Sequence, residues 1–173
     1  MSSLVPAVVE KHLDSIFHWN DGTFVLASSN LTGRYWSGSV WCFKCADDAP
    51  NVEKCLTGVE TDSGVCDAVS VEQNKVIIGT DSGSVELLEF QTNGEAPLLN
   101  SIFYGLEHDD LVSCVDVNSS GDKAVSCSYD KSIKIWDLVS MASVGTYRPA
   151  HTDLVWRISC CPVEPEVFLS CGQ

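Results

Sequence analysis

Short segments of alternating hydrophobic and polar residues dominate the chain, and clusters of Gly, Asn, Asp and Ser separate them. Such alternation is typical of β-strands, and no long stretch keeps a helical period. The turn formers Asn20-Asp21-Gly22 and Asp81-Ser82-Gly83 fit between strands. Regularly spaced strands with such turns predict a sandwich, a barrel or a propeller. The predicted strands are Thr23–Ser29, Ser39–Lys44, Val65–Val71, Lys75–Thr80, Ser84–Phe90, Leu98–Phe103, Val112–Val117, Lys123–Cys127, Ser132–Asp137, Ser143–Tyr147, Val155–Cys160 and Glu166–Ser170.

An internal repeat decides among these three architectures. Three of the predicted strands begin with Ser and follow one template, and their equivalent positions recur at intervals of 45 and 48 residues. His108 and His151 give a second register with an interval of 43 residues, and each is followed by an acidic residue and then an apolar strand. A period of about 40 to 50 residues with four strands is typical of propeller blades. The sequence therefore predicts an all-β propeller, since sandwiches do not repeat in this way.

One repeat carries a recognisable motif. The segment Gly121–Asp137 resembles a WD repeat. In that family a hydrogen-bonded tetrad links a loop, two strands and a tight turn, and His108, Ser126, Asp130 and Trp136 fall at its positions. Because buried polar groups need partners, a relay from the Trp indole N–H through Ser to His and Asp would satisfy all four. A structural role is favoured over a catalytic dyad.

The other two repeats depart from this pattern. Phe43 and Leu88 stand where Trp is usual, no His precedes Val65, and Ser82 takes the place of the Asp. We expect these two blades to be held by apolar packing against their neighbours and not by tetrads.

A closer resemblance covers the chain from about Val9 to its last residue. Its most specific part is Leu31-Thr32-Gly33-Arg34-Tyr35-Trp36-Ser37-Gly38, and further parts are Thr80–Leu87, Glu107–Ser113 and Val167–Cys171. These segments resemble the methylosome WD-repeat proteins, the cofactors of type II protein arginine methyltransferases. The resemblance implies a protein that holds the N-terminal barrel domain of the methyltransferase and helps present Arg-rich substrates, namely the spliceosomal Sm proteins and histone tails. It also implies a role in snRNP assembly and a location in cytoplasm and nucleus.

The residues of the first repeat indicate a partner site. The hairpin is stretched there, and we expect Asn30 to Gly38 to form an extended tip that carries Arg34, Tyr35 and Trp36. A large aromatic beside Arg on a projecting loop has the composition of an interface hot spot. In the resembling family, the Trp and Arg at these positions insert into the methyltransferase. The alternative is that Trp36 folds back onto the outer strand of its own blade.

The charge and the composition of the chain indicate which partners and which cellular compartment the protein has. Ten basic and twenty-four acidic residues give a net charge of −14, which disfavours nucleic acid as a partner. The charge either attracts basic protein tails or serves solubility alone. We expect no membrane association, since no apolar run is long enough to span a bilayer, and no secretory signal. The nine cysteines do not bracket short loops, and most of them sit in apolar strand-like runs, a pattern that favours reduced, buried thiols in a cytosolic or nuclear protein. The pair Cys42 and Cys45 lacks a second pair or a nearby His, so no metal is expected.

No enzyme motif is present: the sequence has no Gly-rich phosphate loop, HExxH or GxSxG. We expect a non-catalytic scaffold that needs no cofactor. The alternative function is that of a WD-repeat adaptor in ubiquitin ligation or trafficking, because propellers bind many unrelated partners. The hairpin with Arg34 and Trp36 favours the methylosome interpretation.

The repeats divide the chain into a flexible segment (residues 1–10), two degenerate blades (11–60, with a long hairpin at 30–38, and 61–104), a full WD repeat (105–148) and the start of a fourth blade (149–173). Propellers have about four to eight blades in a closed ring. We therefore expect an incomplete propeller, from a truncated product or gene model, that is poorly soluble or partly unfolded by itself.

Overall fold

The computed structural model describes residues 12–19, 21–31, 36–72, 74–92 and 96–173. Every regular element in this part of the chain is a β-strand, apart from the short 3-10 segments η1 (Ala46–Asp48) and η2 (Val52–Lys54). The strands are β1 (His12–His18), β2 (Phe24–Leu31), β3 (Trp36–Phe43), β4 (Thr57–Thr61), β5 (Val65–Glu72), β6 (Lys75–Thr80), β7 (Ser84–Gln91), β8 (Leu98–Leu106), β9 (Val112–Val117), β10 (Lys123–Ser128), β11 (Ile133–Asp137), β12 (Ala142–Tyr147), β13 (Val155–Cys160) and β14 (Phe168–Gly172).

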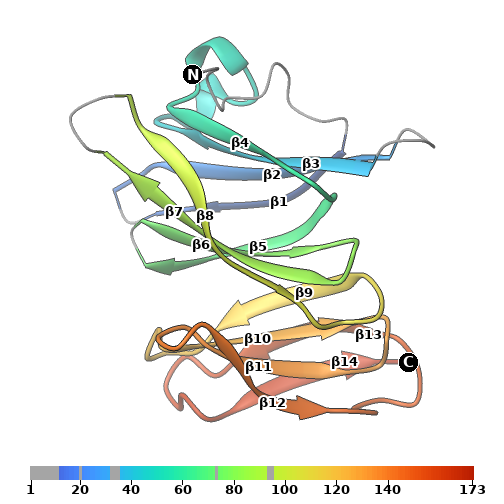
Figure 1. Ribbon diagram of the computed structural model, residues 1–173. Helices are drawn as coiled ribbons and strands as arrows, with labels where there is room; N and C mark the ends of the chain where they lie inside the picture. Colours follow the sequence, from blue (N-terminus) through green and yellow to red (C-terminus); the bar gives the residue numbers. More distant parts are fainter. Residues whose placement is uncertain (1–11, 20, 32–35, 73, 93–95) are drawn as a thin grey trace.

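These strands form three antiparallel four-stranded sheets and one two-stranded sheet. Each sheet takes its strands in chain order: β1–β4, β5–β8, β9–β12 and β13–β14. Figure 1 shows the sheets following one another from the blue end of the chain to the red end, like neighbouring blades. The all-β, partial-propeller prediction is confirmed, and we call these sheets blades 1 to 4.

The repeat predicted from the sequence appears in the strand register. Phe43, Leu88 and Trp136 occupy the same rung of their hairpins, opposite Phe24, Val76 and Ala124 respectively. All three are buried, and each packs in a cluster of hydrophobic side chains. Large apolar side chains at this rung therefore anchor the third strand of every complete blade, whether or not the residue is Trp.

The core lies as slabs between successive blades. Val25, Ala27 and Ile78 belong to the slab between blades 1 and 2, while Ile77 and Trp136 belong to the slab between blades 2 and 3. A third slab joins blades 3 and 4. Burial at about 25 cal/mol per Å² of apolar area makes such slabs the main stabilising contribution, so each blade depends on its neighbour.

The innermost strands share an irregularity. In β1, β5, β9 and β13 the pairing with the next strand skips one residue at the equivalent position, and these residues are Asp14, Cys66, Ser113 and Trp156. A bulge adds local twist and redirects the side chains that follow it. The residues immediately after each bulge therefore lie at equivalent positions on the innermost strands of the four blades.

Two strands were missed by the sequence pattern. β1 is mostly exposed and runs from His12 to His18, and β4 is a five-residue strand that contains Gly58. Neither shows a clear alternation, and β4 becomes a strand through its pairing with β3. His12 and His18 are exposed at the two ends of β1.

Candidate functional site

The hairpin of blade 1 brings Trp36 to the outer end of its sheet. β2 and β3 stay paired as far as Leu31 and Trp36, so Trp36 is on the last rung and its side chain is 55% exposed. The expected tip of Asn30 to Gly38 is too long, because Asn30, Ser37 and Gly38 belong to the strands and their backbone groups are used in the ladder. Arg34 and Tyr35 lie outside the described residues.

Gly38 sets the direction of this hairpin. A Cβ atom at this position would lie 2.6 Å from the carbonyl oxygen of Ser63 and 2.7 Å from the backbone nitrogen of Val65. Only glycine therefore lets β3 approach the segment that leads from blade 1 into blade 2. This close approach fixes the strand that carries Trp36 against a buried part of the fold.

A groove of about 410 Å³ opens beside Trp36, and it is lined by Trp36, Ser37, Glu60, Thr61 and Asp62. Thr61 is buried and its hydroxyl donates to the carbonyl of Ser63 (2.8 Å), which fixes the end of β4. Glu60 and Asp62 are exposed, so the groove combines a large aromatic surface with two carboxylates. An aromatic anchor with adjacent charged groups is suited to binding a protein surface.

The four WD residues meet inside blade 3. The Trp136 indole N–H donates to Ser126 Oγ (2.8 Å), and Ser126 Oγ lies 2.8 Å from His108 Nε2. His108 Nδ1 lies 3.2 Å from the Asp130 carboxylate. Assigning the proton to Nδ1 gives one continuous relay, in which the Ser126 hydroxyl donates to Nε2. Trp136, Ser126 and His108 are all buried, so this group connects β10, β11 and the loop before β9.

A fifth residue, Ser132, belongs to the same network. Its hydroxyl donates to Asp130 Oδ1 (2.6 Å) and lies 2.9 Å from His108 Nδ1. Ser132 was not among the predicted tetrad residues, although the Ser at the start of each repeat template is a sequence signal for it. Ser39 pairs with Ser28 (2.8 Å) and Ser84 with Thr80 (2.6 Å) at the same place in blades 1 and 2. These blades therefore add a hydroxyl pair to the apolar packing that was expected.

The electrostatics of the tetrad fit this structural role. Burial lowers the pKa of His108 below its usual 6.5, despite the neighbouring carboxylate, so the ring stays neutral at pH 7. Burial opposes ionisation of Asp130, but hydrogen bonds from the Ser132 side chain and from the backbone N–H groups of Asp109 and Ser132 outweigh it. Together with His108 they lower the pKa of Asp130 to about 2. The Ser126 hydroxyl is fully buried, out of reach of a substrate.

Blade 4 repeats part of this arrangement. His151 Nε2 lies 2.9 Å from the Ser170 hydroxyl, which corresponds to the contact between His108 and Ser126. The two histidines, 43 residues apart in the sequence, therefore make equivalent hydrogen bonds in successive blades.

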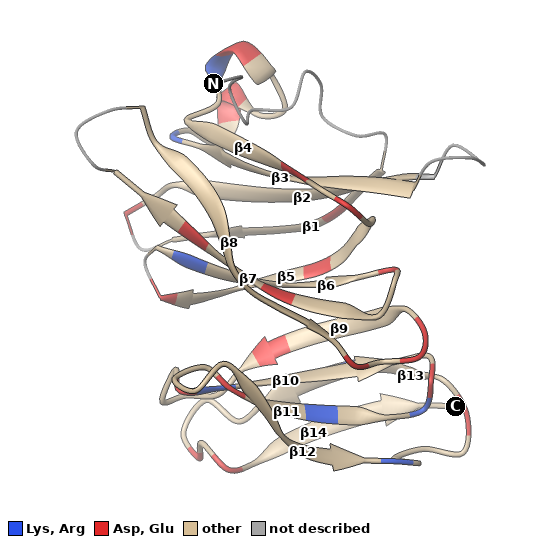
Figure 2. Cartoon of the chain, viewed as in Figure 1, with Lys and Arg blue, Asp and Glu red and all other residues tan. Residues whose placement is uncertain are grey.

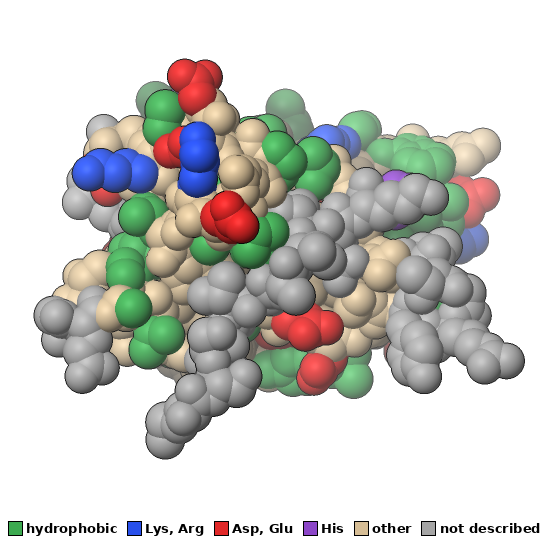
Figure 3. Space-filling model, turned by 90° about the horizontal axis from the view of Figure 1, so that it is seen from above, with side chains coloured by type: hydrophobic (Ala, Val, Ile, Leu, Met, Phe, Trp, Pro, Cys, Tyr) green, Lys and Arg blue, Asp and Glu red, His purple; other side chains and the backbone are tan. Residues whose placement is uncertain are grey.

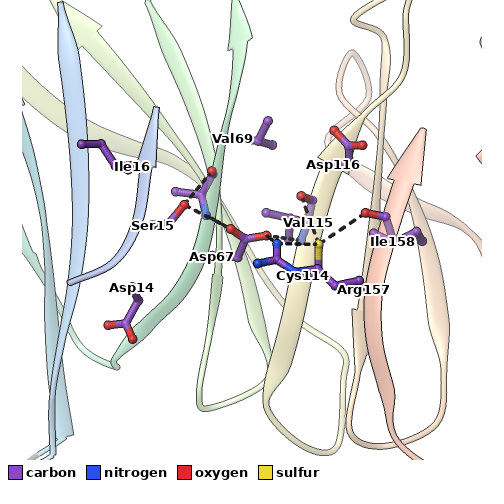
Figure 4. A pocket seen from close by; sticks show the side chains of 11 residues that line it. Asp14, Ser15, Ile16, Asp67, Val69, Cys114, Val115, Asp116, Arg157 and Ile158 are labelled. Carbon is purple, nitrogen blue, oxygen red and sulfur yellow. Dashed lines mark hydrogen bonds and ion pairs between the residues drawn. The ribbon is translucent and has the colours of Figure 1, made fainter. Parts of the chain in front are cut away.

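A second pocket, of about 390 Å³, lies among the innermost strands (Figure 4). The residues that follow the shared bulge are Ser15, Asp67, Cys114 and Arg157, and all four line it. The Asp67 carboxylate accepts hydrogen bonds from the Ser15 hydroxyl (3.1 Å) and from the backbone N–H of Val115 (3.2 Å). Arg157 lies 3.8 Å from the same carboxylate. Asp67 therefore joins blades 1, 2, 3 and 4 near the centre.

Two other carboxylates at this pocket are also occupied. Asp116 accepts the backbone N–H of Cys160 (2.7 Å) from the next blade, and Asp14 accepts the Ser29 hydroxyl (2.6 Å) within blade 1. Because these groups already have partners inside the protein, the pocket is better explained as a brace between blades than as a binding site.

The nine cysteines are free thiols. Cys42, Cys114 and Cys127 are buried, and burial raises the pKa of Cys42 to about 12. The expectation that most thiols are buried is wrong, because Cys55, Cys66, Cys160 and Cys161 are half-buried, and Cys45, which follows the end of β3, and Cys171 on β14 are exposed. Within the described residues no group of three or more His, Cys, Asp or Glu side chains is placed to hold a metal ion. The described part also contains no helix long and apolar enough to cross a membrane.

Sequence comparisons agree with the fold. The family model "WD domain, G-beta repeat" matches residues 101–137, which include the tetrad of blade 3. WD repeat-containing protein 90 of Xenopus tropicalis is 27% identical over 58% of the chain, and transducin beta-like protein 3 of Bos taurus is 29% identical over 59%. The chain covers 5% and 12% of these relatives. Blades, tetrad and family model together show a WD repeat within part of a propeller.

One relative matches over nearly the whole chain. Methylosome protein WDR77 of Xenopus laevis is 40% identical over 168 residues, which are 97% of this chain and 50% of that protein. The chain is a homologue of methylosome protein WDR77, and it spans half of that relative's length.

Proposed function

We propose that the protein is a non-catalytic WD-repeat scaffold of the methylosome. It binds a type II protein arginine methyltransferase through the end of the blade 1 hairpin and helps present Arg-rich substrates, Sm proteins and histone tails, for symmetric dimethylation. Its site of action is the cytoplasm and the nucleus. The homology to methylosome protein WDR77 over 97% of the chain supports this assignment.

The observation that carries the proposal is the position of Trp36. Trp19, Trp41 and Trp136 are buried, whereas Trp36 is 55% exposed on the last rung of a hairpin fixed by Gly38. Leaving a tryptophan in water forgoes about 1.5 to 3 kcal/mol of burial. A partner that covers it recovers this free energy, as in an interface hot spot. Trp36 is the anchor, with Arg34 and Tyr35 beside it in the sequence.

Surface charge supports the choice of substrate. Acidic residues outnumber basic ones over the whole fold (Figure 2), in line with the net charge of −14. Seen from above, hydrophobic side chains are spread among charged ones (Figure 3). A negative field of this kind attracts Arg-rich tails and raises their rate of encounter.

Purification of the tagged protein from cell extract tests the assignment against the adaptor alternative. The proposal expects a protein arginine methyltransferase to co-purify with the wild type and to be lost with Trp36→Ala. Recovery of a ubiquitin ligase or a vesicle coat, with no methyltransferase, would overturn it. Trp156→Ala is the matched control, because Trp156 is also exposed but lies in blade 4.

A further inference from the structure

Blades 1 and 2 form a second groove at their outer rim. Their outermost strands, β4 and β8, lie in contact. Between them is a cavity of about 240 Å³, to which Glu60, Asp62, Glu86, Ser101 and Tyr104 contribute. Glu60, Thr61 and Asp62 also line the groove beside Trp36, so the two cavities are neighbours. Figure 2 shows acidic residues on β4 and on β7, the strand behind β8.

Glu86 is the unusual group in this rim groove. Its side chain belongs to a residue that is only 8% exposed, yet the described residues offer it no cation. Its carboxylate accepts hydrogen bonds from the hydroxyls of Ser101, which lies across the groove at the long distance of 3.5 Å from Oε2, and of Ser84 on its own strand. A buried carboxylate costs free energy unless its charge is compensated, and the described residues supply hydroxyl donors to Glu86 but no positive charge.

At the equivalent position of blade 3, the charged side chain has a partner of opposite charge. Glu86 and Lys134 each stand two residues after the Ser of the repeat template, Ser84 and Ser132, and they face Tyr104 and Thr146 respectively. Lys134 is paired at 3.3 Å with Glu107, in the segment that leads from β8 into β9. Blade 2 holds a carboxylate at this rung and has no such internal partner within the described residues.

Around Glu86 the groove is arranged for a cation. Burial, and then the charge of Asp62, raise the pKa of Glu86, because both disfavour its negative charge. A cation bound beside the carboxylate would favour that charge. The ring of Tyr104, directly opposite Glu86, is 53% exposed and offers a face on which a guanidinium can stack. A planar guanidinium also donates to two carboxylates at once, which an ammonium does less well.

From this geometry we propose that the rim groove between β4 and β8 binds an arginine side chain of a basic protein segment. The guanidinium donates to Glu86 and to Asp62 or Glu60, and it packs on the ring of Tyr104. The site is distinct from the Trp36 anchor, and it stands whether or not the methyltransferase binds there.

The test uses a blocked Gly-Gly-Arg-Gly-Gly peptide and the same peptide with citrulline, which has the shape of arginine without its charge. Binding to the protein is followed by NMR titration at low salt, with the resonances of Tyr104 as the local readout. We expect the arginine peptide to shift these resonances and to bind at least tenfold more tightly than the citrulline peptide. Equal affinities, or shifts confined to other blades, would overturn the proposal.

Two variants separate the site from the general negative charge. Glu86→Gln is expected to weaken binding of the arginine peptide at least tenfold, while Glu107→Gln, which removes the same charge from blade 3, leaves the affinity within twofold. A thermal melt shows that each variant is folded. If the two variants weaken binding equally, the attraction is nonspecific and the proposed site is wrong.

Discussion

Replacing Ser126 by alanine should destabilise the protein more than any exposed Ser replacement. Ser126 Oγ is fully buried, accepts the indole N–H of Trp136 at 2.8 Å and lies 2.8 Å from His108 Nε2. Removing the hydroxyl leaves two buried polar groups without this partner. Each costs about 1 to 3 kcal/mol, so the free energy of unfolding should fall by about 2 to 6 kcal/mol.

Urea unfolding followed by tryptophan fluorescence measures this loss. Ser120→Ala is the control, because Ser120 is exposed in the turn before β10 and such changes usually stay within about 0.5 kcal/mol. The two variants remove the same atom, so their difference isolates the tetrad. A loss for Ser126→Ala within about 0.5 kcal/mol of the control would refute the view that the relay is a stabilising element.

Three further predictions concern backbone positions and pH. Gly38→Ala should displace the blade 1 hairpin and lower stability by about 1 to 3 kcal/mol, because its Cβ would lie 2.6 Å from a carbonyl oxygen; an unchanged melting temperature would contradict this. Gly83→Ala should cost a similar amount, since φ is +89° and the Cβ would lie 2.5 Å from the carbonyl oxygen of His108, and urea unfolding decides it. Stability should fall as the pH drops below 6.5, because the unfolded state protonates His108 before the folded state does, and again between 3.8 and about 2 through Asp130. His108→Gln should flatten the first step in a pH series of unfolding free energies, and an unaltered step would assign it elsewhere.

The propeller was predictable because its signals are local and repeated. Ten of the strands in blades 2 to 4 alternate clearly enough to be placed from the sequence. β1 and β4 were not, because β1 is mostly exposed and β4 owes its conformation to pairing with β3. The hairpin end was placed too early, since nothing in the sequence shows that the ladder continues to Leu31 and Trp36.

Site residues divide in the same way. The motif led to His108, Ser126, Asp130 and Trp136, because their spacing is that of a known repeat. The central brace and the rim groove could not be predicted, since they join residues from different blades. Asp67 meets Val115 only because every innermost strand carries the same bulge.

The affinity of Trp36→Ala for the type II protein arginine methyltransferase tests the central claim most directly. Titration calorimetry with the wild-type protein, Trp36→Ala and Trp156→Ala gives the comparison. The account predicts that Trp36→Ala loses about 2 kcal/mol or more of binding free energy, roughly a thirtyfold weaker Kd, while Trp156→Ala changes little. An unchanged Kd for Trp36→Ala would contradict the role of the blade 1 hairpin as the anchor.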